Sequence, residues 1–185
     1  MSSTNRGRAR EGLDRYYTPE TIAECLVDLL GLRAGEHVVE PSIGGGAFAR
    51  ACLRRDCTVT GIDLDPQAEG LSLVNGLCTD LLSTSIEADW YIGNPPYKHA
   101  EEHLRHALGH TRRGCAFLLR LAFLESARRF RFWSDHPAAE VYVMSKRPSF
   151  TGGKTDSCAY AWFVWRGDHQ GPAAMTILPP TFGMA

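Results

Sequence analysis

Short apolar runs alternate along the chain with stretches in which hydrophobic residues recur at helical spacing. Each run is short enough for one buried strand, and the runs lie at residues 37–40, 57–63, 89–93, 115–121, 140–144 and 158–165, with a weaker one at 71–82. Helical spacing is clearest at Ile22, Cys25, Leu26, Leu29 and Leu30, and further helices are predicted near residues 49–55, 99–110 and 125–133. Strands that alternate with helices predict an α/β fold built on a mostly parallel sheet.

Length and composition narrow the kind of protein that this fold can serve. With 185 residues the chain is long enough for one sizeable core and too short for two ordinary domains. We expect a flexible basic arm over 1–15, one domain over 16–166 and a C-terminal tail over 167–185. Six scattered cysteines without a CxxC pair predict reduced thiols, and the lack of a long apolar segment predicts a soluble, cytoplasmic protein without a membrane partner. The net charge of −1 means that nucleic-acid affinity would have to come from local basic patches.

The run at 89–93 stops abruptly at Asn94-Pro95-Pro96-Tyr97. Neither proline has a backbone N–H, and each restricts the residue before it, so Asn94 is held off the strand end with little freedom. The Asn94 side-chain oxygen and the Pro95 carbonyl can both accept from one NH2 group, while the Tyr97 ring offers a face for a planar base. The loop therefore suits an exocyclic amine on an aromatic ring; the alternative is a tight turn with an aromatic plug.

A glycine loop, Ser42-Ile43-Gly44-Gly45-Gly46, follows the run at 37–40 and leads into a helix. Glycines let the backbone turn tightly and approach a ligand at the carboxyl edge of a parallel sheet. Glu40, at the end of the first strand, is placed to meet a positive group on that ligand. The loop also satisfies the dinucleotide fingerprint at Gly44, Gly46 and Ala49, so an NAD-binding oxidoreductase is an alternative interpretation.

Acids end the next strand as well. Asp63 is predicted to accept both ribose hydroxyls of a nucleoside ligand, and Asp65 is predicted to cap the turn that begins at Pro66. The alternative is the opposite assignment of the two residues.

Before the first helix, Thr18 is predicted to be the N-cap and Pro19 the first helical residue.

Three of these motifs resemble those of S-adenosylmethionine-dependent methyltransferases that modify amino nitrogens: N6 of adenine, N4 of cytosine or the amide of a protein glutamine. The resemblance rests on Asn94-Pro95-Pro96-Tyr97, on the glycine loop read as Glu-Pro-x-x-Gly-x-Gly-x-Phe over 40–48, and on Tyr17-Thr18-Pro19. The N-terminal position of the last motif is similar to the class in which adenine N6 of DNA is the usual target. Small stand-alone methylases of phage and prophage are the forms that the chain resembles most.

The resemblance implies a Rossmann-like class I fold, with a seven-stranded, mostly parallel sheet, an antiparallel last strand and helices on both faces. It implies catalysis by Asn94, Pro95, Pro96 and Tyr97, with an extruded base held between Tyr97 and Phe150. It also implies an S-adenosylmethionine site made by Tyr17, Thr18, Pro19, Glu40, Ser42, Gly44, Gly46, Phe48, Asp63, Leu64, Asp80, Leu81 and Asn94.

Basic residues suggest where a nucleic acid could lie. Arg128, Arg129 and Arg131 interleave with aromatic residues, and Lys154 lies in a polar glycine loop, so these four are candidate contacts to a nucleic-acid backbone. For the rings Phe130 and Trp133, inward packing is favoured. His99, His103, His106 and His110 share a helix face, but the charged surface around them favours an ordinary helix over a metal site.

Several functions remain open at this point. DNA is the expected partner, and since no separate target-recognition domain is expected, either a homodimer or a separate specificity partner is compatible with the sequence. The alternatives are an RNA adenine-N6 methyltransferase, a protein glutamine methyltransferase and a non-catalytic nucleic-acid-binding module.

Overall fold

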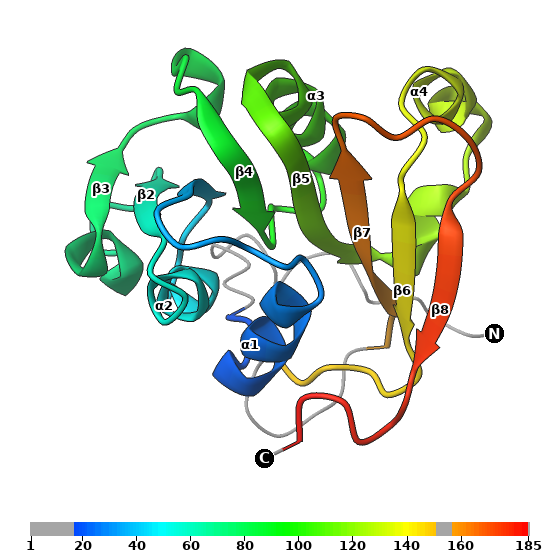
Figure 1. Cartoon of the computed structure of the whole chain (residues 1–185), viewed down its shortest axis with the longest axis horizontal. Helices are drawn as coiled ribbons and strands as arrows, with labels where there is room; N and C mark the ends of the chain where they lie inside the picture. The colour runs from blue at the N-terminus through cyan, green and yellow to red at the C-terminus, as the bar shows by residue number, and fades with distance from the viewer. Residues whose placement is uncertain (1–16, 151–156, 185) are drawn as a thin grey trace, which may run out of the picture.

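An eight-stranded sheet runs through the centre of the molecule (Figure 1). The computed structural model describes residues 17–150 and 157–184, and within them the strand order is β3-β2-β1-β4-β5-β7-β6-β8. The strands are β1 (His37–Pro41), β2 (Thr58–Asp63), β3 (Asn75–Cys78), β4 (Ala88–Gly93), β5 (Thr111–Arg120), β6 (Glu140–Met144), β7 (Tyr160–Arg166) and β8 (Ala174–Leu178). Strand β7 is antiparallel to both of its neighbours, and the other pairs are parallel. The predicted mostly parallel α/β sheet is confirmed.

Helices cover both faces of the sheet, as predicted. Helices α1 (Glu20–Asp28) and α2 (Ala47–Leu53) pack on one face, and α3 (Ala100–His110) and α4 (Phe130–Asp135) pack on the other. Short 3₁₀ turns connect the elements at η1 (Glu69–Leu73), η2 (Leu81–Ser83), η3 (Leu121–Leu124) and η4 (Ala127–Arg129). Among the described helices, none is both long and apolar enough to cross a membrane.

The order of the strands fixes where a ligand can bind. Strand β1 lies between β2 and β4 and is parallel to both, so the chain reverses its direction of travel across the sheet at the β1–β4 pair. In open α/β sheets the crevice at such a switch point, outside the carboxyl ends of the strands, receives the ligand. The glycine loop follows β1 and Asn94 follows β4, and hence both lie at this crevice.

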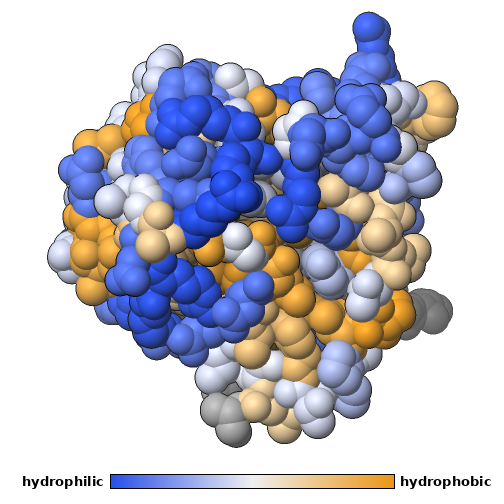
Figure 2. Space-filling view, in the orientation of Figure 1, coloured by the Kyte–Doolittle hydropathy of each residue, from blue (hydrophilic) through white to orange (hydrophobic). Residues whose placement is uncertain are grey.

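The predicted number of seven strands is wrong, because the stretch expected to be a tail contains β8. This strand pairs in parallel with β6, and Met175 and Ile177 on it are 68% and 61% exposed. Figure 2 shows apolar surface at the right-hand edge of the molecule, over β8. Beyond β8 the chain returns to α1, where Phe182 packs against the core and a Cβ on Gly183 would meet Ile22 at 2.8 Å.

The burial of the aromatic residues of α4 differs from the prediction. Phe132 is fully buried and Trp133 is partly buried, whereas Phe130 is 74% exposed. Helix α4 has only six residues, so Phe130 stands at its first position and faces solvent, while Phe132 packs between Trp133 and His136. The inward orientation predicted for Phe130 is therefore wrong.

Candidate active site

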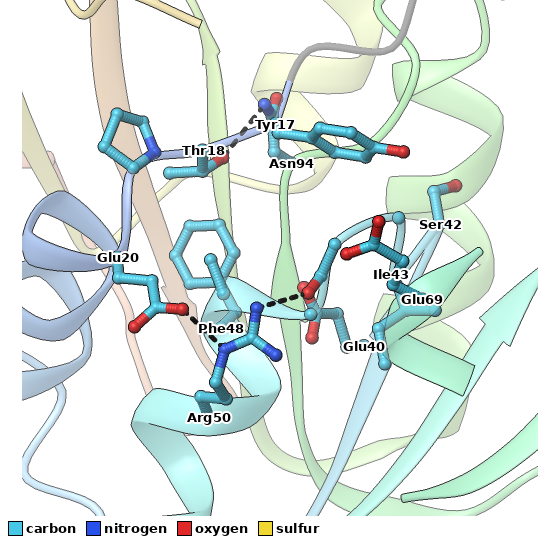
Figure 3. Close-up of a pocket in the computed structure, with 15 residues that line it drawn as sticks. Tyr17, Thr18, Glu20, Glu40, Ser42, Ile43, Phe48, Arg50, Glu69 and Asn94 are labelled. Atoms are coloured by element: carbon cyan, nitrogen blue, oxygen red, sulfur yellow. Dashed lines mark hydrogen bonds and ion pairs between the residues drawn. The ribbon is translucent and has the colours of Figure 1, made fainter. Parts of the chain in front are cut away.

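A pocket of about 340 Å³ opens at the carboxyl edge of β1 and β4 (Figure 3). Small-molecule sites in proteins begin at about 300 Å³, so this volume suits a ligand of nucleoside size. The pocket is lined by Tyr17–Glu20, Glu40, Ser42–Phe48, Arg50, Glu69 and Asn94. The lining thus brings together the N-terminal motif, the glycine loop and the first residue of the loop after β4.

The glycine loop adopts a backbone that few other residues could follow. Ser42, Gly44 and Gly46 have φ values of 59°, 48° and 76°, in the left-handed region. The loop is also closely covered on two sides. A Cβ on Gly46 would lie 2.8 Å from a Leu73 side-chain carbon, and a Cβ on Gly44 would lie 3.1 Å from the Tyr17 ring. Glycine is therefore required here for both conformation and space.

Glu40 is buried beneath the loop, with 3% of its surface exposed. Its carboxylate accepts a hydrogen bond of 2.6 Å from the Ala49 backbone N–H, in the first turn of α2. Burial raises the pKa of Glu40 well above its usual range, and the hydrogen bonds from Ala49 and Phe48 and the charge of Arg50 partly oppose this. The carboxylate therefore occupies the amino end of α2, where an anionic ligand group would otherwise bind.

The remaining charges give the pocket an acidic lining. Glu20 and Glu69 also line it, and among the described residues of the lining Arg50 is the one of opposite charge. The Arg50 guanidinium donates to Glu20 at 2.6 Å and to the Gly45 carbonyl at 2.7 Å. Figure 3 marks the contact between Arg50 and Glu20 with a dashed line. Because Arg50 and Glu20 pair with each other, Glu40 and Glu69 are the acidic groups left in the described lining, which favours a ligand that carries positive charge.

The Asn94 side chain reaches back to the N-terminal motif. Its amide nitrogen, Nδ2, donates a hydrogen bond of 3.2 Å to the Thr18 hydroxyl (Figure 3). Thr18 is 9% exposed, and α1 begins after Pro19, whose position as N-cap carries no side-chain hydrogen bond. The prediction that Thr18 caps α1 is therefore wrong, because its side chain is turned toward Asn94.

Tyr97 lies in a cluster with an arginine and another aromatic residue. The Arg120 guanidinium lies 4.4 Å from the centre of the Tyr97 ring, and the Tyr160 ring centre lies 5.7 Å away. Burial raises the pKa of Tyr97 well above its usual range; hydrogen bonding to Tyr160 acts in the same direction, and hydrogen bonding to Asn94 lowers it. The phenol is thus neutral at physiological pH and faces the same Asn94 side chain that binds Thr18.

Phe150, which was predicted to hold a base together with Tyr97, is buried against Tyr160. Its side chain is 7% exposed, and its ring packs edge-on against Tyr160 with 5.0 Å between centres. Tyr160 thus contacts both of the rings that were predicted to hold a base, and that role stays a prediction.

The acid after β2 serves the glycine loop rather than the pocket wall. Asp63 accepts backbone hydrogen bonds of 2.9 Å from Gly44 and 2.9 Å from Asp65, and it is not among the lining residues. The predicted cap is confirmed, since Asp65 accepts from the Gln67 N–H at 3.0 Å. Leu64 is 70% exposed and lies outside the lining.

The pair predicted after β3 is also outside the pocket lining. Asp80 accepts from the Leu82 N–H at 3.0 Å and so caps η2, while Leu81 is 3% exposed in the core.

Glu69 is a residue of the pocket lining that the sequence analysis did not predict. It is carried by η1, which docks on the glycine loop through a hydrogen bond of 2.8 Å from the Gly70 N–H to the Gly44 carbonyl.

The candidate nucleic-acid contacts have different surroundings. Arg129 lies over the Phe123 ring at 4.7 Å and pairs with Glu101 at 3.8 Å, so it serves packing. Arg128 is exposed, and the Arg131 side chain is 91% exposed. Lys154 and the basic arm over 1–15 lie outside the described residues.

The four histidines of the α3 face do not form a metal site. Within residues 17–150 and 157–184, no group of three or more metal-binding side chains comes together. His103 is instead 8% exposed, and its burial, together with the charge of His99, lowers its pKa to about 4.

Comparison with known proteins shows which proteins the chain is similar to. No protein-family model matches the chain. A curated relative, the type II methyltransferase M.CvrRI of Paramecium bursaria Chlorella virus XZ-6E, is 26% identical over 91 residues, which are 44% of this chain and 24% of the relative. The chain thus spans about a quarter of that protein.

Solved structures extend the similarity to most of the chain. The type I restriction-modification methyltransferase subunit of Streptococcus thermophilus superposes with a TM-score of 0.68 at 16% identity, over 84% of this chain and 46% of that one. The 23S rRNA methyltransferase ErmE gives 0.60 at 20% identity, over 84% and 72%. Magnesium protoporphyrin IX methyltransferase from Synechocystis PCC 6803, with bound SAM, gives 0.57 at 14% identity, over 79% and 77%. The chain has the class I, Rossmann-like methyltransferase fold.

Proposed function

We propose that the protein is an S-adenosylmethionine-dependent methyltransferase that acts on the exocyclic amine of a nucleic-acid base, with adenine N6 of DNA as its target. The observation that carries this proposal is that Asn94 lines the same pocket as the glycine loop. An acceptor for an amine and a site for a cationic cofactor are therefore adjacent. The partial sequence match to a type II methyltransferase supports the same function.

The acidic lining supports S-adenosylmethionine over NAD. S-adenosylmethionine carries a sulfonium and an ammonium group, which the Glu40 and Glu69 side chains of the lining would favour. NAD carries a pyrophosphate, which dinucleotide-binding folds place at the amino end of the first helix. Here the Glu40 carboxyl group already accepts from the Ala49 N–H in that position, so this donor is not open to a phosphate.

The loop after β4 would supply the chemistry on the amine. An adenine amine is a poor nucleophile because its lone pair is delocalised into the ring. When Asn94 Oδ1 and the Pro95 carbonyl accept its two N–H groups, the lone pair becomes localised as the nitrogen turns pyramidal. When bound, S-adenosylmethionine supplies the methyl group.

Alignment would provide much of the acceleration. The Asn94 loop would hold the amine with its lone pair turned toward the pocket of the glycine loop, in the orientation that an in-line displacement requires. The extra proton then leaves the nitrogen for water. In a duplex the base must first be flipped out, and Tyr97 is the ring of the loop on which it would stack.

The residues around Tyr97 indicate what must move before such a base could stack on its ring. Arg120 covers one face of the Tyr97 ring at 4.4 Å, so a base that stacks on this face would require the guanidinium to move. A displaced arginine beside an extruded base is well placed to meet the nucleic-acid backbone. Arg120 is accordingly a better candidate for a nucleic-acid contact at this site than Arg129, which serves packing.

Transfer of labelled methyl from S-adenosylmethionine to unmodified duplex DNA, single-stranded DNA and RNA tests the proposal. Label in DNA that disappears in Asn94→Ala, with cofactor binding by calorimetry retained, is the expected result. Label only in RNA would support the rRNA-type alternative that the ErmE likeness suggests. Tight cofactor binding without label in any nucleic acid would overturn the choice of substrate class.

A further inference from the structure

The side-chain amide of Asn94 is held from outside its own loop. Its Nδ2 atom donates to Thr18 Oγ1 at 3.2 Å, a contact between residues 76 positions apart in the chain. Figure 3 shows the nitrogen directed at the Thr18 hydroxyl. Thr18 is buried, and Asn94 is only partly exposed, so water competes little for this bond.

Thr18 is itself firmly placed. It precedes Pro19, after which α1 begins, and the Ala23 N–H donates to the Pro19 carbonyl at 3.0 Å. Helix α1 is tied to α2 through the ion pair between Glu20 and Arg50. The hydroxyl that binds Asn94 is therefore fixed by the same packing that shapes the glycine loop.

An asparagine amide has two different ends, and only one of them suits an amine. The oxygen accepts from N–H groups, whereas the NH2 end would direct its own hydrogens at the hydrogens of the substrate amine. A half-turn about the Cβ–Cγ bond exchanges the two ends while barely changing the shape of the side chain. Something other than shape must therefore choose the orientation. A hydroxyl can accept from Nδ2 or donate to Oδ1, and in the structure Thr18 Oγ1 accepts from Nδ2.

We propose that Thr18 is a positioning residue that holds the Asn94 amide with its nitrogen turned inward and its oxygen toward the substrate amine. The inference rests on the proposed function and adds to it a role for the N-terminal motif in the methyl-transfer step, besides any contact with cofactor. Thr18 acts through Asn94 and touches no reacting atom.

The motif also joins this contact to the cofactor site. The Tyr17 ring lies over the glycine loop, where a Cβ on Gly44 would come within 3.1 Å of it, and Thr18 is the next residue. A ligand in the glycine loop thus contacts the segment that orients Asn94.

The test compares Thr18→Val, which keeps the shape and removes the hydroxyl, with Thr18→Ser, which keeps the hydroxyl. We expect Thr18→Val to lower kcat about tenfold, equivalent to about 1.4 kcal/mol, which is the size of one buried hydrogen bond. The KM for nucleic acid and the Kd for S-adenosylmethionine should stay within about threefold. Thr18→Ser should restore kcat to within about twofold of the wild type.

The control removes a threonine hydroxyl elsewhere. Thr84 donates to the Leu81 carbonyl at 2.7 Å in η2, outside the pocket lining, and Thr84→Val should leave kcat unchanged. An unchanged kcat in Thr18→Val would overturn the proposal. So would an equal loss of kcat in Thr18→Val and Thr18→Ser, because that result indicates a packing role for which the hydroxyl is irrelevant.

A second readout does not depend on activity. The side-chain NH2 signals of Asn94, assigned by their loss in Asn94→Ala, should be well separated in wild type and Thr18→Ser and should move together in Thr18→Val. Signals that are identical in all three proteins would refute the contact. If the wild type transfers no methyl group to any acceptor, the proposed function fails, and these spectra alone decide whether Thr18 holds Asn94.

Discussion

Acidification should destabilise the protein through one buried histidine, His103 on α3. Its pKa lies at about 4 in the folded protein, against 6.5 for an ordinary histidine, because burial and the nearby charge of His99 disfavour the protonated form. The unfolded chain begins to bind a proton as pH falls below 6.5, and the folded protein does so only near pH 4. The contribution of neutral His103 to the free energy of unfolding is therefore fully present above pH 6.5, and it is lost as the pH falls from 6.5 to 4.

The size of this effect follows from the difference in pKa. One pKa unit corresponds to about 1.36 kcal/mol, so the shift from 6.5 to about 4 is worth about 3 kcal/mol of unfolding free energy. Asp80 and Glu102 oppose the shift, and His106 reinforces it. Within the described residues the buried Nδ1 atom of His103 has no hydrogen-bond partner, so a non-titrating side chain can replace it without breaking a bond.

Urea unfolding at several pH values between 7 and 4 measures the effect in wild type and in His103→Leu. The wild type should lose about 3 kcal/mol more than the variant across this range, since carboxylates titrate equally in both. The control is His169→Gln, which removes a histidine that hydrogen bonds to the Gly171 carbonyl at 3.0 Å, away from α3. Parallel curves for wild type and His103→Leu would refute the reasoning.

Three further predictions concern the pocket. Asn94→Ala should lower methyl transfer by at least about a hundredfold, with S-adenosylmethionine binding by calorimetry largely kept, because the lost acceptor acts in the transition state; turnover near that of the wild type would contradict the mechanism. Glu40→Gln should weaken S-adenosylmethionine binding about tenfold, since a cationic cofactor favours the ionised form of the Glu40 carboxyl and glutamine cannot ionise; an unchanged Kd would contradict the electrostatic argument. Gly70→Ala should destabilise the protein by about 1–3 kcal/mol in urea unfolding, because the new Cβ would lie 2.6 Å from Ile43 and 2.9 Å from the Gly46 backbone nitrogen. Gly109→Ala, in α3 with nothing within 4 Å, is its control and should stabilise by about 0.5–1 kcal/mol; equal effects of the two substitutions would refute the close-approach argument.

Much of the sheet could be read from the sequence because its signals are local. Six of the apolar runs correspond to strands β1, β2, β4, β5, β6 and β7, since buried strands need continuous hydrophobic residues. The glycine loop and the Asn94 loop were predicted at the strand ends where the structure has them. In contrast, β8 lies between Pro172 and Pro179 with an exposed, short pattern, and only its pairing with β6 makes it a strand.

The errors in the site come from contacts between residues far apart in the sequence. Thr18 followed by Pro19 has the local signal of a helix cap, but its partner is Asn94, which no local rule could indicate. Likewise, the sequence around Phe150 does not indicate the contact with Tyr160 that buries its ring. Glu69 entered the pocket because Gly70 packs against Gly44, a close approach that residue spacing does not encode.

The measurement that tests the central claim most directly is mass spectrometry of nucleosides from unmodified duplex DNA incubated with the protein and S-adenosylmethionine. The proposed function predicts N6-methyladenine with the wild type and none with Asn94→Ala. The absence of any methylated nucleoside with the wild type, under conditions where calorimetry shows bound S-adenosylmethionine, would contradict it.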